Sequence, residues 1–457
     1  MKKISLLVLY FCLTSSSWAV NLLEVFQDAL ENDPQYQEEM IKTQISLNDI
    51  RISASTLLPH VGFTAQPLTD NQTSEGAITA NGLQPANNVY RVMDMRLSVA
   101  QPVFNMRNFL RLSAAKLSHQ AACAHLNAEF QNLMLKVVKA YFNTLFYENN
   151  LIYYDLHKRT MAKQLRQVQE RHRLGKANGR DVSNAQSALS VAESDYIDMQ
   201  MQLMDRQQEL AQITNHDYTH LSFLNDSFPL LSPQPSNLKV WIAIALKQNW
   251  TIKTNQLLVR VAKERVKQQF AGHLPVINAY IDYDSQNFHA KKGSLIVAQG
   301  SSSQKNMAAY LNLTVPIYSG GLITATTKKF YNMAKMDRLR LDFSLRETVL
   351  MVKQNYMRIL ADLQRIKNDK QAILSAKKLL RASQEQYELG SGNIMDVIQQ
   401  QNQLIRTQIN YNRDKYNYII ELLSLKKAAG TLSIEDLKVV NCWLKNNAKY
   451  QIMLKKP

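Results

Sequence analysis

Few side chains in this 457-residue chain have the spacing that catalysis or metal binding requires. His216 and His220 are four residues apart, but they fall where a helix is expected to end, and no third metal ligand accompanies them. Asp282 and Asp284 share one face of an expected strand, which is typical of a polar surface rather than of a catalytic pair. No nucleophile is paired with a base in the sequence. We therefore predict no enzymatic activity, no cofactor and no metal site.

Two short stretches combine glycine, asparagine and aspartate at matching positions. They are RLGKANGRDV at 173–182 and ELGSGNIMDV at 388–397. A left-handed glycine ends a helix, an asparagine caps the next one, and a carboxylate in its first turn is favoured by the helix dipole. We therefore predict two helix–turn–helix tips, at 174–181 and 389–396. The residues in these roles are Gly175, Asn178 and Asp181 in the first tip and Gly390, Asn393 and Asp396 in the second.

The elements that carry these tips are expected to be very long helices. Four runs contain neither glycine nor proline, and these are 103–174, 180–228, 322–389 and 393–429. Apolar residues recur in them at three- and four-residue spacing, as in Phe130, Leu133, Met134 and Val137. A helix of 72 residues would be roughly 108 Å long, far beyond a globular domain. The pattern favours long helices that pack side by side as in coiled coils.

The chain repeats itself once. The two tips are 215 residues apart, and LSVAQPVFN at 97–105 matches LNLTVPIYS at 311–319. We therefore predict two structural repeats, 20–230 and 231–432, followed by a C-terminal segment at 433–457.

Each repeat contains a pair of segments with strand character, at about 61–102 and 276–317. Apolar and polar residues alternate there, as in RVMDMRLSVA at 91–100. Loops rich in asparagine, glycine and serine are expected at 70–88 and 289–306. Strands of about ten residues suit a tilted transmembrane β-strand, although a half-buried soluble hairpin has the same pattern. Four strands do not close a barrel alone, so the membrane interpretation requires an oligomer.

The N-terminus has the pattern of a secretory signal peptide at 1–19. Lys2 and Lys3 precede ten apolar residues and a small-residue cleavage site after Ala19, with no lipid anchor expected. Removal of the two lysines lowers the formal net charge from +17 to +15. Because the basic residues are spread along helical segments, we expect a solvated surface and no nucleic-acid partner. Cys123 and Cys442 do not form a disulfide framework, and no segment is a transmembrane helix.

Together these features resemble the TolC-type trimeric outer-membrane efflux channels. The resemblance covers nearly the whole mature chain, and its most specific motifs are LLPHVG, AQPVF, AYFNTL, ELAQIT, HLP, VPIYSGG, QNY and AAGTL. It implies a mixed fold: a homotrimer whose chains share a 12-stranded β-barrel in the outer membrane and a 12-helix barrel across the periplasm. It also implies contact with outer-membrane lipid, a periplasmic adaptor protein and an inner-membrane pump of the RND, ABC or MFS type.

At the strand–helix junctions, proline suits the end of a strand or the start of a helix, and a glycine pair lets the backbone turn. The junction residues are Pro102, Pro316, Gly320 and Gly321.

The resemblance also assigns roles to the second tip, which would form the inner hairpin at the periplasmic entrance. Asp396 would contribute one acid per subunit to the pore constriction, and Gln399 stands where TolC has a second acid. Asp181 and Tyr387 match members of a hydrogen-bonded gate lock, whereas Gly392 replaces its arginine. We therefore predict a less acidic and more weakly latched entrance, with Arg180 as a candidate substitute for the missing arginine.

The function that the resemblance implies is a passive exit duct for tripartite efflux or type I secretion, gated at its periplasmic end. Two alternatives share long helices: a periplasmic coiled-coil adaptor and a helical pore-forming protein. The adaptor would have one hairpin between other domains, and the pore-former would lack the internal repeat. The sequence does not indicate whether the cargo is drugs or proteins.

Overall fold

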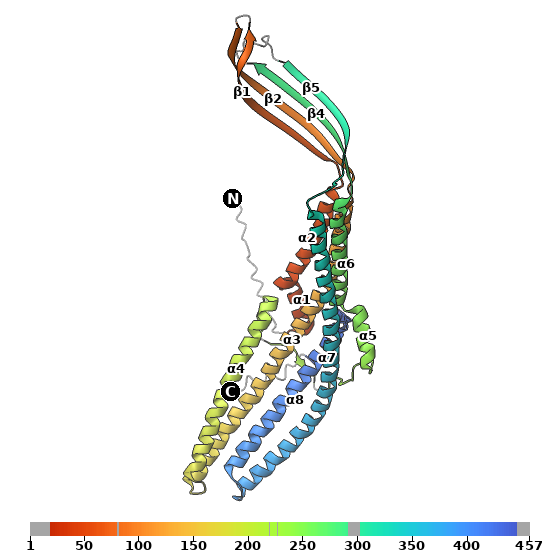
Figure 1. Cartoon of the computed structure of the whole chain (residues 1–457). Coiled ribbons are helices and arrows are strands. Elements are labelled where there is room, and N and C mark those ends of the chain that lie inside the picture. Colours follow the sequence, from red (N-terminus) through yellow and green to blue (C-terminus); the bar gives the residue numbers. More distant parts are fainter. Residues whose placement is uncertain (1–18, 80–81, 219, 226, 291–301, 446–457) are drawn as a thin grey trace, which may run out of the picture. The chain divides into compact units, whose positions relative to one another are not determined.

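The computed structural model describes residues 19–79, 82–218, 220–225, 227–290 and 302–445 (Figure 1). The predicted signal peptide lies outside these residues except for Ala19, as does the tail after residue 445. The order of elements occurs twice: two helices, two strands and two long helices. The first set is α1 Leu22–Asn32, α2 Pro34–Ser55, β1 His60–Thr79, β2 Gly82–Phe104, α3 Met106–Arg173 and α4 Gly179–Thr214. The second set is α5 Leu238–Gln248, α6 Trp250–Phe270, β4 Val276–Ala290, β5 Ser302–Thr314, α7 Leu322–Glu388 and α8 Ile394–Ala428.

The long helices have nearly equal lengths in the two sets. Helices α3 and α7 contain 68 and 67 residues, and α4 and α8 contain 36 and 35. The glycine-free run 180–228 is helical only in its first part, and the helix ends just before His216, where the sequence analysis expects an end. Helix α4 ends at Thr214 because Asn215 adopts the left-handed conformation, with φ of 57°. Asparagine therefore ends this helix where the sequence offers no glycine.

The chain packs as two compact units, and neither coincides with one repeat. The first unit combines the residues before 42 with 125–252 and those after 343. The second combines 42–124 with 253–343. Each unit therefore takes pieces from both halves of the sequence.

The core of the first unit is formed by α1, the C-terminal elements among the described residues and the middle of the long helices. Tyr141, Phe142 and Leu145 of α3 are completely buried there. The Tyr141 hydroxyl bonds to the carbonyls of Val20 and Ser222, at 3.1 and 3.0 Å. The C-terminal elements complete this core. They are α9 Ile434–Cys442 and β6 Leu444–Lys445, and β6 pairs with β3 Phe223–Leu224.

One acid in this core is poorly solvated. The Glu148 side chain is 10% exposed, 3.7 Å from His220 Nδ1. Burial raises the pKa of Glu148 from its usual 4.5 to about 8, and a hydrogen bond from the Leu221 backbone offsets this only in part. Since the pKa is higher in the folded chain, stability from this group is fully present below pH 4.5 and is lost as the pH rises toward 8.

Glu148→Gln is therefore expected to flatten the pH dependence of stability between those limits. The wild type should lose up to about 1.4 kcal/mol per pH unit across this range from this one proton. The variant, which lacks the ionising group, should gain relative stability as the pH is raised from 5 to 8. Thermal unfolding of both proteins at several pH values measures this, and parallel curves for the two proteins would contradict the prediction.

The second unit contains a four-stranded antiparallel sheet in the order β1-β2-β4-β5. The predicted loop at 70–88 is wrong, because β1 and β2 continue through it as paired strands up to Thr79 and Gly82. The segment is polar, but pairing with the neighbouring strand satisfies its backbone hydrogen bonds. Most of the loop predicted at 289–306 lies outside the described residues, and β4 and β5 bound it at Ala290 and Ser302.

The predicted alternation produces rows of like side chains across the sheet. Phe63, Leu97, Tyr283 and Met307 are register partners in one apolar row. Their exposed fractions are 68, 43, 39 and 73%. The next row along contains Arg96 and Asp284, which form an ion pair at 2.5 Å. One set of apolar side chains is therefore left uncovered by the chain itself.

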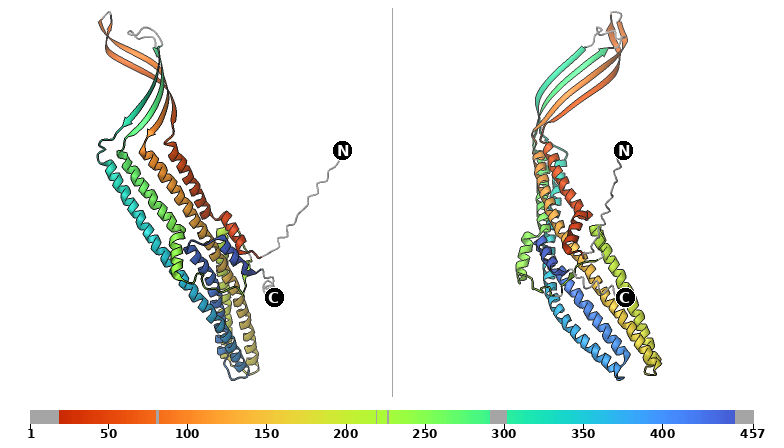
Figure 2. Two further views of the ribbon diagram at one scale, coloured as in Figure 1. Left: turned by 90° about the vertical axis from the view of Figure 1, so that its right-hand side faces the viewer. Right: turned by 180° about the vertical axis from the view of Figure 1, so that it is seen from behind.

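Helices follow the strands directly in this unit, and α2, α3, α6 and α7 lie side by side as one layer (Figure 2). Pro102 lies near the end of β2, where the register shifts before Phe104. Pro316 lies between β5 and α7, and Gly320 and Gly321 have φ of 58° and 79° before α7 begins. Within the described ranges, no helix has the length and apolar content to cross a membrane.

Candidate functional site

The two tips begin in the same way, with a glycine that ends the long helix. Gly175 and Gly390 have φ of 71° and 80°, and each follows the end of a long helix. After each glycine the next N–H returns to a carbonyl five residues back: Lys176 to Arg171 at 2.8 Å and Ser391 to Gln386 at 3.0 Å. This is the Schellman pattern, which satisfies carbonyls that the helix end leaves free. The chain then reverses into α4 and α8.

The caps of the returning helices use their carboxylates differently. In α4, Asp181 Oδ2 accepts from the Asn178 N–H at 3.3 Å, and Asn178 Oδ1 accepts from the Asp181 N–H at 2.9 Å. This closes a capping box. In α8, Asn393 caps the helix by accepting from the Met395 N–H at 3.0 Å. The Asp396 carboxylate takes no part in that cap and is exposed in the first turn.

The exposed face of α8 carries both residues assigned to the constriction. Asp396 and Gln399 are exposed, whereas Val397 and Ile398 between them are buried. The buried pair joins an apolar cluster that also includes Val168 of α3 and Leu380 of α7. Packing of the hairpins against each other thus fixes which face of α8 presents the acid.

A non-covalent contact between the two hairpins was not predicted from the sequence. Arg171, near the end of α3, donates to the backbone carbonyls of Tyr387 and Glu388 at 3.0 and 3.2 Å. Its guanidinium also lies 4.6 Å from the centroid of the Tyr387 ring. The last carbonyls of a helix lack intrahelical donors and form the negative end of its dipole, so a guanidinium is well suited to them. We call this set of contacts the Arg171 clamp.

Of the residues predicted for the gate lock, Tyr387 is part of this clamp. The Tyr387 hydroxyl is buried and has no hydrogen-bond partner in the part of the chain that the structure describes. Asp181 is engaged with Asn178 instead. The role of Asp181, Tyr387 and Gly392 in a gate lock stays a prediction. Arg180, the candidate substitute, is exposed in the first turn of α4.

The turn at Gly392 leaves little room for the arginine that the resemblance implies there. A Cβ at this position would lie 3.0 Å from the Tyr387 nitrogen and 3.0 Å from the Gln386 Cβ. The Gly392 N–H also bonds to the Gln386 carbonyl at 3.0 Å. The cation that contacts the end of α7 therefore comes from α3.

A cavity of about 760 Å³ lies beside the clamp, between α3, α7 and α8. Arg171 and Tyr387 line it, together with Ile394 and Val397 at the start of α8. The two hairpins are therefore incompletely packed at the tip. The clamp and the apolar cluster are the contacts that join them.

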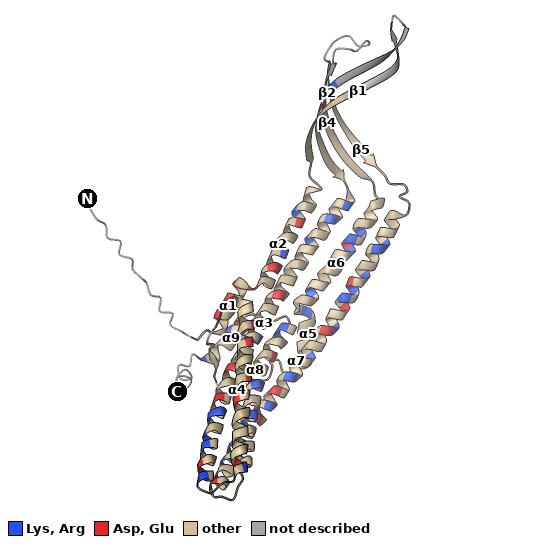
Figure 3. Cartoon of the chain, turned by 90° about the vertical axis from the view of Figure 1, so that its left-hand side faces the viewer, with Lys and Arg blue, Asp and Glu red and all other residues tan. Residues whose placement is uncertain are grey.

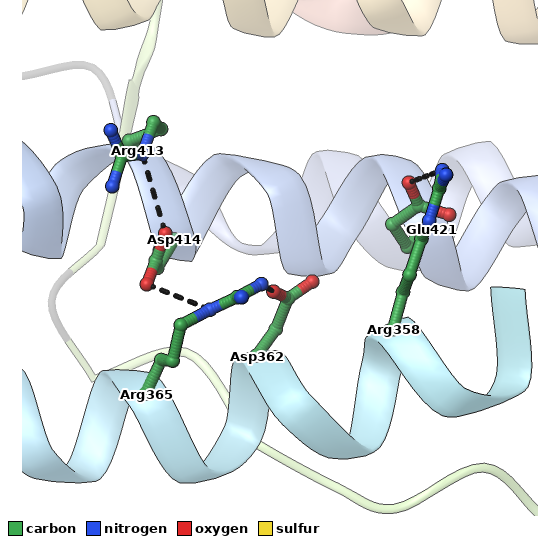
Figure 4. A network of polar contacts seen from close by, with 6 residues as sticks. All are labelled: Arg358, Asp362, Arg365, Arg413, Asp414 and Glu421. Carbon is green, nitrogen blue, oxygen red and sulfur yellow. Dashed lines mark hydrogen bonds and ion pairs between the residues drawn. The ribbon is translucent and has the colours of Figure 1, made fainter. Parts of the chain in front are cut away.

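Farther from the tip, charged side chains join α7 to α8 (Figure 4). Arg365 of α7 reaches Asp414 of α8 at 3.1 Å and also pairs with Asp362. Asp362 and Asp414 are 1 and 3% exposed. Burial raises the pKa of Asp362, although Arg365 opposes this. Removing Arg365 would leave buried Asp362 without its cation and Asp414 with Arg413 alone, at 3.5 Å, and loss of one partner is the costly way to break a buried pair.

The same figure shows Arg358 of α7 reaching Glu421 of α8 at 3.1 Å. Two ion pairs therefore join α7 and α8 in the part of the hairpin that is distant from the tip. Across the described ranges no three His, Cys, Asp or Glu side chains are grouped so as to hold a metal ion.

Known proteins are similar to this chain in sequence and in fold. The model of the family described as "Outer membrane efflux protein" matches residues 25–216 and 241–431. The chain is 27% identical to the outer membrane protein TolC of Vibrio cholerae over 439 residues, covering 95% of this chain and 96% of that protein. It is 22% identical to the alkaline protease secretion protein AprF of Pseudomonas aeruginosa, covering 94% and 88%. The fold is similar to the CmeC outer membrane channel of Campylobacter jejuni, with a TM-score of 0.75, 16% identity and coverage of 93% and 90%.

Proposed function

The chain belongs to the outer membrane efflux protein family, and on that premise we propose that three copies assemble into one continuous exit duct. It is an outer-membrane protein with a periplasmic tunnel, and it provides the exit route for efflux and type I secretion. The observation that carries this function is the family match, which covers both repeats and therefore both strand pairs and both tips. Transport through the proposed duct is passive.

The sheet supports the trimeric assembly. Its outer strands β1 and β5 leave backbone groups unpaired at both edges, and such edges are not stable in lipid. Three copies of four strands would close a 12-stranded barrel in which every edge finds a partner. The apolar row of Phe63, Leu97, Tyr283 and Met307 would then face the outer-membrane lipid.

The helices support it in the same way. Large apolar side chains of α7 are exposed in the single chain, among them Tyr331, Leu339 and Phe343 at 63, 63 and 66%. Neighbouring protomers would cover such side chains in a 12-helix barrel. A periplasmic adaptor would dock near the tips and connect the duct to an inner-membrane pump of the RND, ABC or MFS type.

Heat-modified migration tests the assembly and separates the alternatives. The protein should fractionate with the outer membrane and run as a trimer in SDS unless it is boiled. A periplasmic adaptor would appear in the soluble or inner-membrane fraction. A helical pore-forming protein would be soluble before it inserts. Either result would contradict the proposed duct.

The entrance is proposed to carry one acidic ring, formed by Asp396 from each subunit. Asp396→Asn is expected to lower the cation-to-anion permeability ratio about tenfold or more, since three charges near a narrow axis each attract a cation by up to about 1 kcal/mol in water-like surroundings. Gln399→Asp, one turn along the same exposed face, should change the ratio in the opposite direction. Reversal potentials in a salt gradient measure both variants. An unchanged ratio in Asp396→Asn would place the constriction elsewhere.

A further inference from the structure

The net positive charge of the chain is concentrated in the helices of the second unit. Residues 42–55, 106–124, 253–270 and 322–343 contain fifteen Lys and Arg but only four Asp and Glu. The expectation that the basic residues are not clustered is therefore wrong, because the fold places these segments side by side next to the sheet (Figure 3). A surface with this excess attracts anions, and two neighbouring helices of the layer form a hollow in which several of its cations converge.

The hollow is a groove of about 350 Å³ between α3 and α6, which we call the α3–α6 groove. Lys116 lines it from α3, and Arg260, Lys263 and Lys267 line it from α6. Ser113 adds a hydroxyl and Glu264 the one carboxylate of the lining residues. All four cations belong to residues that are exposed to solvent. The lining therefore offers several donors to an anion.

The carboxylate of the groove does not balance these cations. Glu264 already bonds to Lys267 at 2.7 Å and lies 3.5 Å from the Ser113 hydroxyl. Within the described residues, Lys116, Arg260 and Lys263 have no carboxylate partner. Arg260, Lys263 and Lys267 also follow one another at three- and four-residue spacing on a single helix face, where like charges destabilise the helix. A bound anion would remove this repulsion.

The groove lies close to the sheet that the proposed function places in the membrane. Lys267 and Lys263 are three and seven residues before the end of α6 at Phe270, which corresponds to roughly 5 and 10 Å along the helix. Strand β4 begins at Val276. The polar headgroup layer on each side of a bilayer is about 5–8 Å thick. Phosphate headgroups of the adjacent leaflet would thus approach the groove from the side of Lys267, and Lys263 would lie one turn farther from the membrane.

We propose that the α3–α6 groove binds the phosphate group of an anionic phospholipid in the adjacent leaflet. The lipid source rests on the proposed function, whereas the affinity of the groove for a phosphate anion does not. Lysine is suited to phosphate as a point charge, and Arg260 adds a planar donor group. Clusters of four or more cations beside a membrane segment are known to recognise anionic headgroups.

Lipid titration of the purified full chain tests the proposal. Short-chain phosphatidylglycerol is added below its micelle concentration, with phosphatidylcholine as the neutral probe and inorganic phosphate as the soluble one, and binding is measured by calorimetry. Lys263→Gln/Lys267→Gln should weaken phosphatidylglycerol binding about 30-fold, from two charges near the headgroup. Lys328→Gln/Lys329→Gln is the matched control, because it removes two exposed lysines of the same layer that lie outside the groove. It should change binding less than threefold.

An equal loss in both double variants would overturn the groove and leave diffuse attraction only. Binding of phosphatidylcholine as tight as that of phosphatidylglycerol would also overturn it. If inorganic phosphate binds as tightly as phosphatidylglycerol, the phosphate site stands and the lipid source is overturned. Trimer migration of the same samples is recorded alongside. A failed trimer would count against the proposed function, and a failed titration with an intact trimer would count against the groove alone.

Discussion

Replacing Arg171 with alanine is expected to open the periplasmic entrance of the duct. The side chain donates two hydrogen bonds to the carbonyls of Tyr387 and Glu388 and stacks on the Tyr387 ring. Hydrogen bonds from a charged donor contribute about 1.5–3 kcal/mol each, and a solvent-exposed cation–π contact about 0.5–1. With partial exposure the clamp should contribute about 3 kcal/mol to the closed state, so its loss shifts the closed-to-open ratio roughly 100-fold.

Single-channel recording in planar bilayers measures this shift as time spent at higher conductance. Arg171→Lys should lie between wild type and alanine, because an ammonium retains the charge but lacks the planar fork that reaches two carbonyls. Arg180→Ala is the matched control, since it removes an exposed cation from the neighbouring turn. If Arg180→Ala opens the channel more than Arg171→Ala, Arg180 is the substitute for the missing gate arginine and the clamp is not part of the gate.

The helices and the tips could be predicted because their signals are local. The conformation of Gly175 and Gly390 and the capping by Asn178 and Asn393 depend on residues within one turn. Arg171 could not be assigned in this way, because it acts on carbonyls 216 and 217 residues later in the chain. The rotation of α3 against α7 decides which arginine reaches them, and helical periodicity alone does not define that rotation. The separations of 216 and 217 residues are close to the 215 residues between the two tips, and this similarity is the one feature of the sequence that relates Arg171 to the end of α7.

The strands could be predicted only in part, because their local sequence signal does not extend over their whole length. The alternation at 91–100 predicted the part of β2 near the helices, where one face is apolar. Farther along, asparagine, glycine and serine suggested a loop, yet the ladder continues to Thr79 and Gly82. Antiparallel pairing satisfies the backbone whatever the side chains are, so composition identifies a strand only where a face must be apolar.

The clustering of positive charge could not be predicted from the sequence for a related reason. Fifteen cations in four separate segments look evenly distributed in the sequence, and only the side-by-side packing of α2, α3, α6 and α7 gathers them (Figure 3). No short-range pattern in the sequence reports that packing.

Gly430→Ala is expected to be the most destabilising single methyl addition among the glycines at the helix ends. Gly430 follows α8 with φ of 73°, and a Cβ there would lie 2.5 Å from the Gln248 carbonyl oxygen and 2.7 Å from the Asn249 Cα. The obstructing atoms are backbone atoms held in place, because Asn249 Nδ2 also donates to the Ala428 carbonyl at 2.9 Å. The left-handed conformation costs a non-glycine residue about 1–2 kcal/mol, and overpacking a fixed site adds about 1–3. The free energy of unfolding of Gly430→Ala is therefore expected to be lower than that of the wild type by about 3 kcal/mol or more.

Gly175→Ala separates the two contributions, because Gly175 has nearly the same φ of 71° with no atom within 4 Å of the added Cβ. Its free energy of unfolding should fall only by the cost of the left-handed backbone conformation, about 1–2 kcal/mol. Denaturant unfolding of both variants and the wild type measures the difference, with equal slopes required for the comparison. An equal loss at the two sites would mean that the junction of α5 and α6 moves away from α8 without cost. A larger loss at Gly430 would establish that close backbone packing, and not the turn alone, requires glycine in the AAGTL motif.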